Sequence, residues 1–222
     1  LDGGAKVIHV NYKSAQVDQV YFPQIEVVGD IALSVDALGA LIGSKLSLNL
    51  EEFETVRDHV KEKIFQTDEN TEFPMKPQRI VSEIRKQMGY HDIIALDNGV
   101  YKIWFARNYL AYQPNTILLD NALATMGAGL PSAMTAAMIH PNRKVMSICG
   151  DGGFMMNSQE LETAVRLDLN IIVLVLNDSS YGMIRWKQAG MGFSDWGLEY
   201  NNPDLVRYAE CYGAHGHRIS SV

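Results

Sequence analysis

The sequence predicts an α/β fold built on a doubly wound parallel sheet, and two observations carry this prediction. From Pro77 onward, short apolar runs that read as strands alternate with stretches whose apolar residues recur at helical spacing. In addition, the run Ile171–Leu176 (IIVLVL) lacks any polar alternation, which is typical of a strand buried on both faces of a parallel sheet.

The N-terminal part holds one predicted strand and one predicted helix. Ala5–Val10 (AKVIHV) is a short apolar run and is expected to form a strand. Ile31–Gly43 has apolar residues at helical spacing and ends in glycine, a common helix terminator. Two elements bury too little apolar surface to fold alone, so residues 1–43 are interpreted as the C-terminal end of a preceding α/β domain.

Residues 44–76 differ in composition and are interpreted as an interdomain connection. The segment ends in a proline-rich stretch, Pro74 to Pro77, and residues 50–65 are expected to form a solvated helix within it. Its acidic residues are Glu51, Glu52, Glu54, Asp58, Glu62, Asp68, Glu69 and Glu72.

Residues 77–222 form the main predicted domain. The apolar runs predict strands at 92–96, 116–119, 144–149 and 171–176, with a last strand at 214–219. Helical spacing predicts helices at 78–88, 101–112, 130–139, 158–167 and 203–211, with Gly89 as a C-cap and Pro131 in a first turn. The sequence stops after Ser220-Ser221-Val222, where a further helix is expected, so this domain is expected to be truncated at its end.

The composition excludes several classes of binding partner and indicates the cellular compartment. The 222 residues include 19 basic and 26 acidic side chains, a net charge of −7, which makes nucleic acid and anionic membrane surfaces unlikely partners. Two cysteines give neither a disulfide framework nor a metal cluster, so a reducing, cytoplasmic location is expected. No apolar run approaches the roughly 20 residues of a membrane-spanning helix. No signal peptide is visible at Leu1, although a targeting signal could precede this non-natural start residue.

A glycine-rich segment after the strand at 144–149 carries the strongest chemical signal. Gly150-Asp151-Gly152-Gly153 is expected to form a turn at the carboxyl end of that strand, where ligands bind in parallel α/β sheets. Such glycines let main-chain N–H groups approach a phosphate, and the Asp151 carboxylate can hold Mg²⁺ against it. Taken alone, the segment could equally be a plain tight turn.

A second acidic residue is expected beside the first. Asp178 follows Asp151 by 178 − 151 = 27 residues, a gap that one helix and the strand at 171–176 fill. Both carboxylates should therefore emerge at the same end of adjacent strands, and two hard oxygen ligands at a phosphate-binding turn predict a Mg²⁺–diphosphate site. Taken alone, Asn177-Asp178 could instead be ordinary turn residues, because Asn and Asp both favour turns.

These segments together resemble the thiamine diphosphate-dependent enzymes, and among them the acetolactate synthases of the catabolic type. Gly150-Asp151-Gly152 with its partner about 27 residues later is similar to the family's cofactor signature. Residues 124–134 (ATMGAGLPSAM) resemble its Gly-Thr-Met-Gly-x-Gly-Leu-Pro stretch, 150–167 (GDGGFMMNSQELETAVRL) resemble acetolactate synthases, and 23–31 (PQIEVVGDI) resemble the end of the middle domain. The resemblance implies three stacked α/β domains, of which this chain holds the end of the second and most of the third.

The resemblance also implies roles for individual residues. Asp151, Asp178 and the main-chain oxygen of Ser180 match the metal ligands, although many relatives have asparagine where this chain has Asp178. Met126 matches the apolar residue that bends the cofactor into its reactive shape, and Ala124 would offer its carbonyl to the pyrimidine amine. The remaining matches to cofactor contacts are Asn98, Gly99, Val100, Tyr101, Gly150, Gly152, Gly153, Tyr181, Gly182 and Met183.

The implied reaction is carboligation. An acetolactate synthase decarboxylates pyruvate on thiamine diphosphate and transfers the acetyl-anion equivalent to a second 2-oxo acid, giving 2-acetolactate. The glutamate that activates the cofactor lies in the family's first domain, usually of a neighbouring subunit, so a homodimer or homotetramer is expected and this chain alone is expected to be inactive. FAD binding is not favoured, because Asn11 stands where flavin-binding relatives tend to have an acidic residue.

Two other readings remain open at this point. The same cofactor could serve a 2-oxo acid decarboxylase that releases aldehyde or a pyruvate oxidase that passes electrons to FAD. Alternatively, the chain could belong to a non-catalytic regulatory or assembly subunit. Two neighbouring carboxylates without a cation would repel each other, which argues against that last reading.

Overall fold

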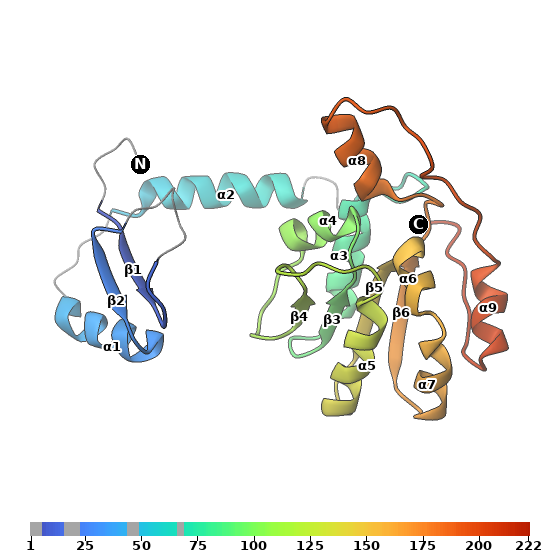
Figure 1. The fold of residues 1–222 in the computed structure, drawn as a ribbon, viewed down its shortest axis with the longest axis horizontal. Coiled ribbons are helices and arrows are strands. Elements are labelled where there is room, and N and C mark those ends of the chain that lie inside the picture. Colours follow the sequence, from blue (N-terminus) through green and yellow to red (C-terminus); the bar gives the residue numbers. More distant parts are fainter. Residues whose placement is uncertain (1–5, 16–22, 44–48, 66–68) are drawn as a thin grey trace. The chain divides into compact units, whose positions relative to one another are not determined.

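The computed structural model describes residues 6–15, 23–43, 49–65 and 69–222, which fall into two compact units, 1–57 and 58–222 (Figure 1). The division between the units falls within helix α2 (Glu51–Phe65), inside the predicted connection. The solvated helix expected there is confirmed, and its side chains are largely exposed. The predicted domain limits at residues 43 and 76 stay predictions.

The first unit contains one strand more than expected. β1 (Ile8–Asn11) pairs in parallel with β2 (Ile25–Val28), so the prediction of a single strand in this region was wrong. The expected strand at 5–10 starts at Ala5, which lies outside the described residues, and the observed strand runs one residue further. Helix α1 (Ile31–Ile42) forms as predicted and ends at Gly43, whose φ of 52° is a left-handed conformation that glycine adopts readily.

The second unit is built on four parallel strands, which confirms the α/β class with a parallel sheet. The strands are β3 (Ile93–Leu96), β4 (Ile117–Leu119), β5 (Val145–Gly150) and β6 (Ile171–Leu176), in the spatial order β4-β3-β5-β6. The register pairs Leu96 with Ile148 and Gly150 with Leu176. The residues that follow β3, β5 and β6 therefore leave the sheet at the same end, where these parallel strands have their carboxyl termini.

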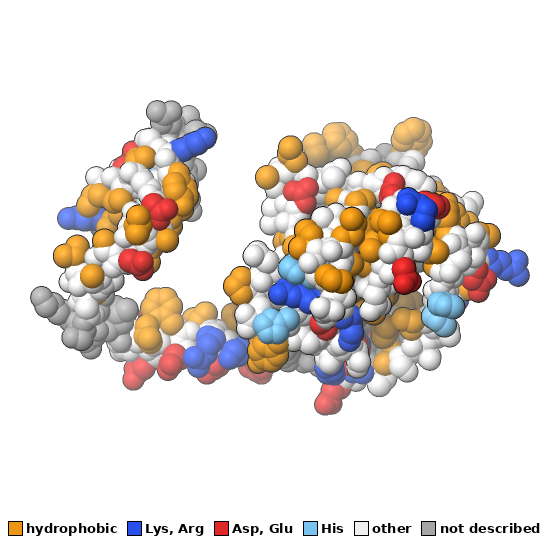
Figure 2. All heavy atoms as spheres, turned by 90° about the horizontal axis from the view of Figure 1, so that it is seen from below, with side chains coloured by type: hydrophobic (Ala, Val, Ile, Leu, Met, Phe, Trp, Pro, Cys, Tyr) orange, Lys and Arg blue, Asp and Glu red, His pale blue; other side chains and the backbone are white. Residues whose placement is uncertain are grey.

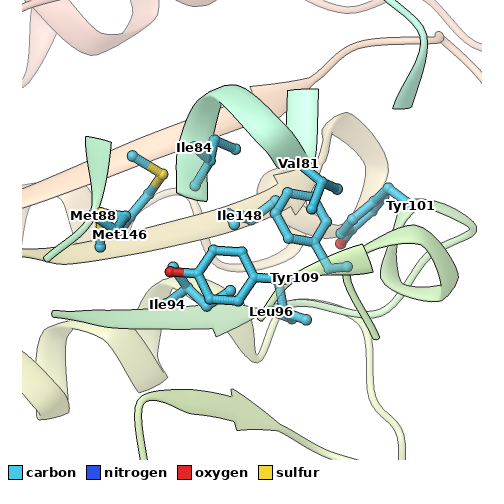
Figure 3. Packing of buried hydrophobic residues seen from close by; sticks show 10 residues of the cluster. Val81, Ile84, Met88, Ile94, Leu96, Tyr101, Tyr109, Met146 and Ile148 are labelled. Carbon is cyan, nitrogen blue, oxygen red and sulfur yellow. The ribbon is translucent and has the colours of Figure 1, made fainter. Parts of the chain in front are cut away.

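Helices α3 (Pro77–Gln87) and α4 (Tyr101–Asn108) cover one face of this sheet. Figure 3 shows side chains of both helices packing over the strands below them, with Val81 and Ile84 of α3 above Ile148 of β5. Alternate strand residues point to this face, which is why the buried cluster includes Ile94 but not its neighbour Ile93.

The opposite face is covered by α5 (Gly129–Ile139), α6 (Asp151–Asn157) and α7 (Glu160–Arg166) (Figure 1). Small side chains let α5 lie close to the sheet, since Ala133, Ala136 and Ala137 pack against Ile93 and Val145. Helices on both faces explain why the central strand β5 is buried over Val145–Cys149.

Several predicted elements differ in detail. β6 lies at the edge of the sheet and is only half-buried, with Ile172 45% exposed, so the expectation that this strand is buried on both faces was wrong. Helix α3 ends at a C-cap formed by Met88 rather than Gly89. Helix α4 stops at Asn108, four residues before the predicted end, because Tyr109 takes an extended conformation.

The C-terminal region contains α8 (Gly182–Gly190) and α9 (Leu205–Cys211) and lacks the strand expected at 214–219. That segment packs against α9 instead: a Cβ added at Gly216 would lie 2.7 Å from the main-chain oxygen of Val206. Residues 214–219 therefore form no strand of this sheet.

On the face drawn in Figure 2, acidic and basic side chains lie interspersed. Along α2, for example, Arg57 pairs with Glu54. No helix among the described residues is both long and apolar enough to cross a bilayer.

Candidate functional site

The predicted site residues lie at the carboxyl ends of β3, β5 and β6 and in the segments that follow these strands and β4. One cleft of the second unit is lined by all but one of them, although it also continues along β6 and beyond. The exception is Ala124, which is exposed and does not line this cleft. The predicted residues in the cleft wall are Asn98, Gly99, Val100, Tyr101, Met126, Gly150, Asp151, Gly152, Gly153, Asp178, Ser180, Tyr181, Gly182 and Met183.

The glycine-rich segment is the start of a helix rather than a free-standing turn, which corrects the prediction. Gly150 is the N-cap of α6, and Asp151, Gly152 and Gly153 form its first turn. The glycines serve close packing. A Cβ at Gly152 would lie 2.7 Å from the Tyr200 hydroxyl, and one at Gly153 would lie 2.4 Å from the carboxylate oxygen Oδ2 of Asp97.

Asp151 is buried, 2% exposed, and its carboxylate is held by four donors. Oδ1 accepts hydrogen bonds from the main-chain N–H of Gly152 at 3.0 Å and from the Tyr200 hydroxyl at 2.9 Å. Oδ2 accepts from the N–H of Ser179 at 2.8 Å and from the side-chain amide of Asn202 at 2.5 Å. The orientation of this carboxylate is therefore fixed by three segments of the chain.

Asp178 lies beside Asp151, as the 27-residue spacing predicts. Burial raises the pKa of the Asp178 carboxyl, and the neighbouring charge of Asp151 raises this pKa further. The neighbouring carboxyl groups of Asp151 and Asp178 concentrate negative charge at a position where a cation would be stabilised.

Ser180 completes this corner of the site. Its main-chain oxygen accepts a hydrogen bond from the N–H of Gly182 at 3.0 Å, and the left-handed conformation of Ser179, with φ of 52°, turns the chain there. The Ser180 hydroxyl is buried, and within the described residues it has no hydrogen-bond partner. Gly182 and Met183 lie in the first turn of α8, so the loop predicted over 181–183 is helical in part.

The donor set fits Mg²⁺ bound together with a phosphate ligand. Two carboxylates and a main-chain oxygen are hard ligands of the kind Mg²⁺ takes, and the remaining positions would go to phosphate and water oxygens. The part of the chain that the structure describes has no group of three or more His, Cys, Asp or Glu side chains suited to a metal.

The segment after β3 forms a second wall of the cleft. Asn98 follows the strand closely, and Lys102 at the start of α4 donates a hydrogen bond to its side-chain oxygen at 3.2 Å. The Tyr101 ring lies against both Gly99 and Gly150, where an added Cβ would lie 2.4 Å and 3.0 Å from it, and burial raises the pKa of its phenol. This ring ties the end of β3 to the end of β5.

Residues 97–222, more than half of the chain, match the family described as "Thiamine pyrophosphate enzyme, C-terminal TPP binding domain". The chain belongs to the thiamine pyrophosphate enzymes. The match begins at Asp97 and includes every predicted site residue, which confirms the family resemblance drawn from the Gly150-Asp151-Gly152 segment.

Curated thiamine pyrophosphate enzymes similar to this chain include several acetolactate synthases. The chain is 32% identical to "Acetolactate synthase" of Bacillus subtilis, over 100% of its own length and 39% of the relative's. It is 32% identical to "Acetolactate synthase, catabolic" of Raoultella terrigena, over 99% of itself and 40% of the relative. It is 31% identical to "Probable acetolactate synthase large subunit" of Methanocaldococcus jannaschii, over 98% and 38%. The chain thus spans about two fifths of the length of these relatives.

Sequence reasoning missed three residues of this thiamine pyrophosphate-binding domain. Asp97 is buried at the end of β3, and Tyr200 and Asn202 reach Asp151 from the segment between α8 and α9. Asp97 directly follows the predicted strand at 92–96, much as Asp151 follows the predicted strand at 144–149 after one residue, and that position was the available signal. Tyr200 and Asn202 gave no such signal, since 49 and 51 residues separate them from Asp151.

Cys149 lies just before the glycine-rich segment and should be chemically inert. Burial raises the pKa of its thiol to about 12, and the side chain is fully buried, whereas Cys211 is exposed. We expect iodoacetamide at pH 8 to modify native Cys149 at least about 10²-fold more slowly than Cys211, because the thiolate is the reactive form. Peptide mass spectrometry over time measures both rates, with protein in urea as the control in which both react. Equal native rates would contradict the burial.

Proposed function

We propose that this chain forms the diphosphate-binding part of an acetolactate synthase. Such an enzyme decarboxylates pyruvate and transfers the acetyl-anion equivalent to a second 2-oxo acid, giving 2-acetolactate. The observation that carries the proposal is the carboxylate pair Asp151 and Asp178 at the ends of adjacent strands, in a thiamine pyrophosphate enzyme. Relatives named acetolactate synthase that align over nearly the whole chain support the choice of reaction.

In this proposal the chain binds and orients the cofactor. Thiamine diphosphate, when bound, supplies an electron sink for the electrons left after loss of carbon dioxide. Asp151, Asp178 and the main-chain oxygen of Ser180 would hold Mg²⁺. Gly152 and Gly153, in the first turn of α6, would face the diphosphate, and Met126 in the cleft lining would support the bent cofactor.

The deciding experiment follows carbon-13 pyruvate by NMR in the presence of the intact polypeptide, Mg²⁺ and thiamine diphosphate. Acetolactate as the main product would support the carboligase proposal. Acetaldehyde would identify a decarboxylase, and acetate or acetyl phosphate together with flavin absorbance would identify an oxidase. No turnover with pyruvate or other 2-oxo acids, despite cofactor binding, would favour a non-catalytic subunit.

Met126 should matter for turnover far more than for folding. Its side chain is half-buried and lines the cleft, so Met126→Ala removes few core contacts. We expect kcat of the intact enzyme to fall roughly 10²-fold, because small misplacements of reacting groups have effects of that size. Met138→Ala, on the exposed side of α5, is the matched control and should retain wild-type kcat. A Met126→Ala enzyme with wild-type kcat would refute this role.

Residues 1–222 alone should not turn over pyruvate. The resemblance places the activating glutamate in another domain, usually of a neighbouring subunit, and we therefore also propose a homodimer or homotetramer as the working enzyme. The comparison pairs the isolated chain with the intact polypeptide in the same pyruvate assay, and sedimentation analysis gives the assembly state. Acetolactate formation by the isolated chain would refute the need for a second domain.

A further inference from the structure

Asp97 is the most buried acidic group of the second unit outside the carboxylate pair, and main-chain donors surround it. The residue is 1% exposed and lies directly after β3. Its Oδ1 accepts hydrogen bonds from the N–H of Asn98 at 2.6 Å and from the N–H of Gly127 at 2.8 Å, and Oδ2 also accepts from Gly127, at 3.1 Å. Burial raises the pKa of Asp97, while hydrogen bonds from the main chain, including those of Ala128 and Gly129, oppose the rise.

Two glycines are fitted closely around this carboxyl group. A Cβ at Gly153 would lie 2.4 Å from Asp97 Oδ2, and a Cβ at Gly129 would lie 2.7 Å from Asp97 Cβ and 3.0 Å from the Asp97 main-chain nitrogen. The distances of 2.4 Å and 2.7 Å are shorter than a real Cβ shows to a non-bonded atom, and 3.0 Å is at that limit. Asp97 therefore contacts the start of α5 and the first turn of α6 as closely as their backbones allow.

The peptide groups around Gly127 are held from a second side as well. Asn157 at the end of α6 donates a hydrogen bond from Nδ2 to the Gly127 oxygen at 2.7 Å. Gly127 has a left-handed φ of 88°, and an added Cβ would lie 2.8 Å from Asn157 Nδ2. With its N–H bound to Asp97 and its oxygen to Asn157, Gly127 fixes the backbone immediately after Met126.

We propose that Asp97 is a positioning residue that fixes three segments of the cleft relative to one another: 98–101, 126–129 and 150–153. It touches neither carboxylate of the pair and acts through the main chain that it binds. Its negative charge matters because four N–H groups converge on it, and such donors need an acceptor with no competing N–H of its own. This inference rests on the proposed function, which assigns these three segments to thiamine diphosphate.

The test uses Asp97→Asn in the intact polypeptide and two measurements. The amide keeps the size of the carboxylate but replaces one of its two acceptor oxygens with an NH₂ group that faces the main-chain donors, which loosens the hold on the Gly127 loop. We expect amide hydrogen exchange of Gly127 and Gly129, measured without cofactor, to accelerate at least tenfold. We expect the Kd for thiamine diphosphate with Mg²⁺, measured by calorimetry, to rise at least tenfold.

Asp92→Asn is the matched control. Asp92 precedes the same strand at its opposite end and also accepts main-chain hydrogen bonds, from Gly89 at 2.6 Å and from Lys144 at 3.3 Å. It lies far from the cleft segments along β3, so this variant should leave both the exchange of Gly127 and the cofactor Kd unchanged. Equal effects of the two variants would reduce Asp97 to a general stability role and overturn the proposal.

The remaining outcomes are also decisive. Unchanged exchange at Gly127, or an unchanged Kd, in a folded Asp97→Asn variant would overturn the proposal. If Asp97→Asn does not fold, Asn157→Ala is tested in its place. Faster amide exchange at Gly127 together with weaker cofactor binding would support the positioning role, and no change in either would overturn it. Wild-type protein that binds no thiamine diphosphate would refute the proposed function itself, a result separate from binding that the variants fail to alter.

Discussion

Replacing Asp151 with alanine should abolish Mg²⁺-dependent binding of thiamine diphosphate to the intact polypeptide. The change removes one of two adjacent carboxylates, and the proposed Mg²⁺ would then lack its buried ligand. It also removes the shared acceptor of four donors, of which Ser179, Tyr200 and Asn202 each keep a second acceptor. The N–H of Gly152 loses its acceptor, and a buried donor left unpaired destabilises the site by about 1–3 kcal/mol. Calorimetric titration with and without Mg²⁺ measures the loss.

Asp178→Asn is the informative companion to Asp151→Ala. An amide oxygen can still ligate Mg²⁺, so this variant should bind the cofactor, and it removes the charge that opposes Asp151. An Asp151→Ala protein that is folded by circular dichroism and binds cofactor with wild-type affinity would refute the metal assignment.

The second large effect is expected from Gly129→Ala. A Cβ at this position would lie 2.7 Å from Asp97 Cβ, 2.9 Å from Cys149 Sγ and 3.0 Å from the main-chain nitrogen of Asp97. Because Asp97 lies directly after β3 and Cys149 lies within β5, the two central strands of the sheet, these neighbours have little room to move. We expect the free energy of unfolding to fall by about 3 kcal/mol, the upper end for overpacking, measured by urea denaturation.

Gly190→Ala tests the same substitution where nothing opposes it. Gly190 is the last residue of α8 and no heavy atom lies within 4 Å of an added Cβ. Alanine favours helix over glycine, so this variant should be unchanged or more stable by about 0.5–1 kcal/mol. Similar losses at both positions would mean that the packing around Gly129 is looser than described.

The sequence predicted those elements whose own pattern determines them. Uninterrupted apolar runs located β3, β5 and β6, and helical spacing located α5 and α9. The burial of β6 was overestimated because the sequence does not reveal which strand lies at the edge of the sheet. The strand expected at 214–219 failed for a related reason, since the contact of Gly216 with the backbone of Val206 is tertiary.

The site shows the same division between local and tertiary information. The proximity of Asp151 and Asp178 was predictable, because neighbouring parallel strands bring residues 27 apart to the same end of the sheet. The observed pairing of Gly150 with Leu176 places both residues there. Asp97, Tyr200 and Asn202 were not predictable, since each matters only through partners about 30 to 50 residues away. A single aspartate after a strand is interpreted as a turn residue until the N–H groups that donate hydrogen bonds to it are known.

The strand order β4-β3-β5-β6 has a consequence for where the cleft can lie. The chain leaves β3 through α4 on one face, and it leaves β5 through α6 on the other. The direction of winding thus reverses between β3 and β5, and the two outgoing segments part at a topological switch point, which opens a crevice beyond the strand ends. Asp97 and Asp151 lie on the two sides of this crevice. The location of the site is therefore a property of the winding order, and substitutions at these residues should remove binding while leaving the crevice in place.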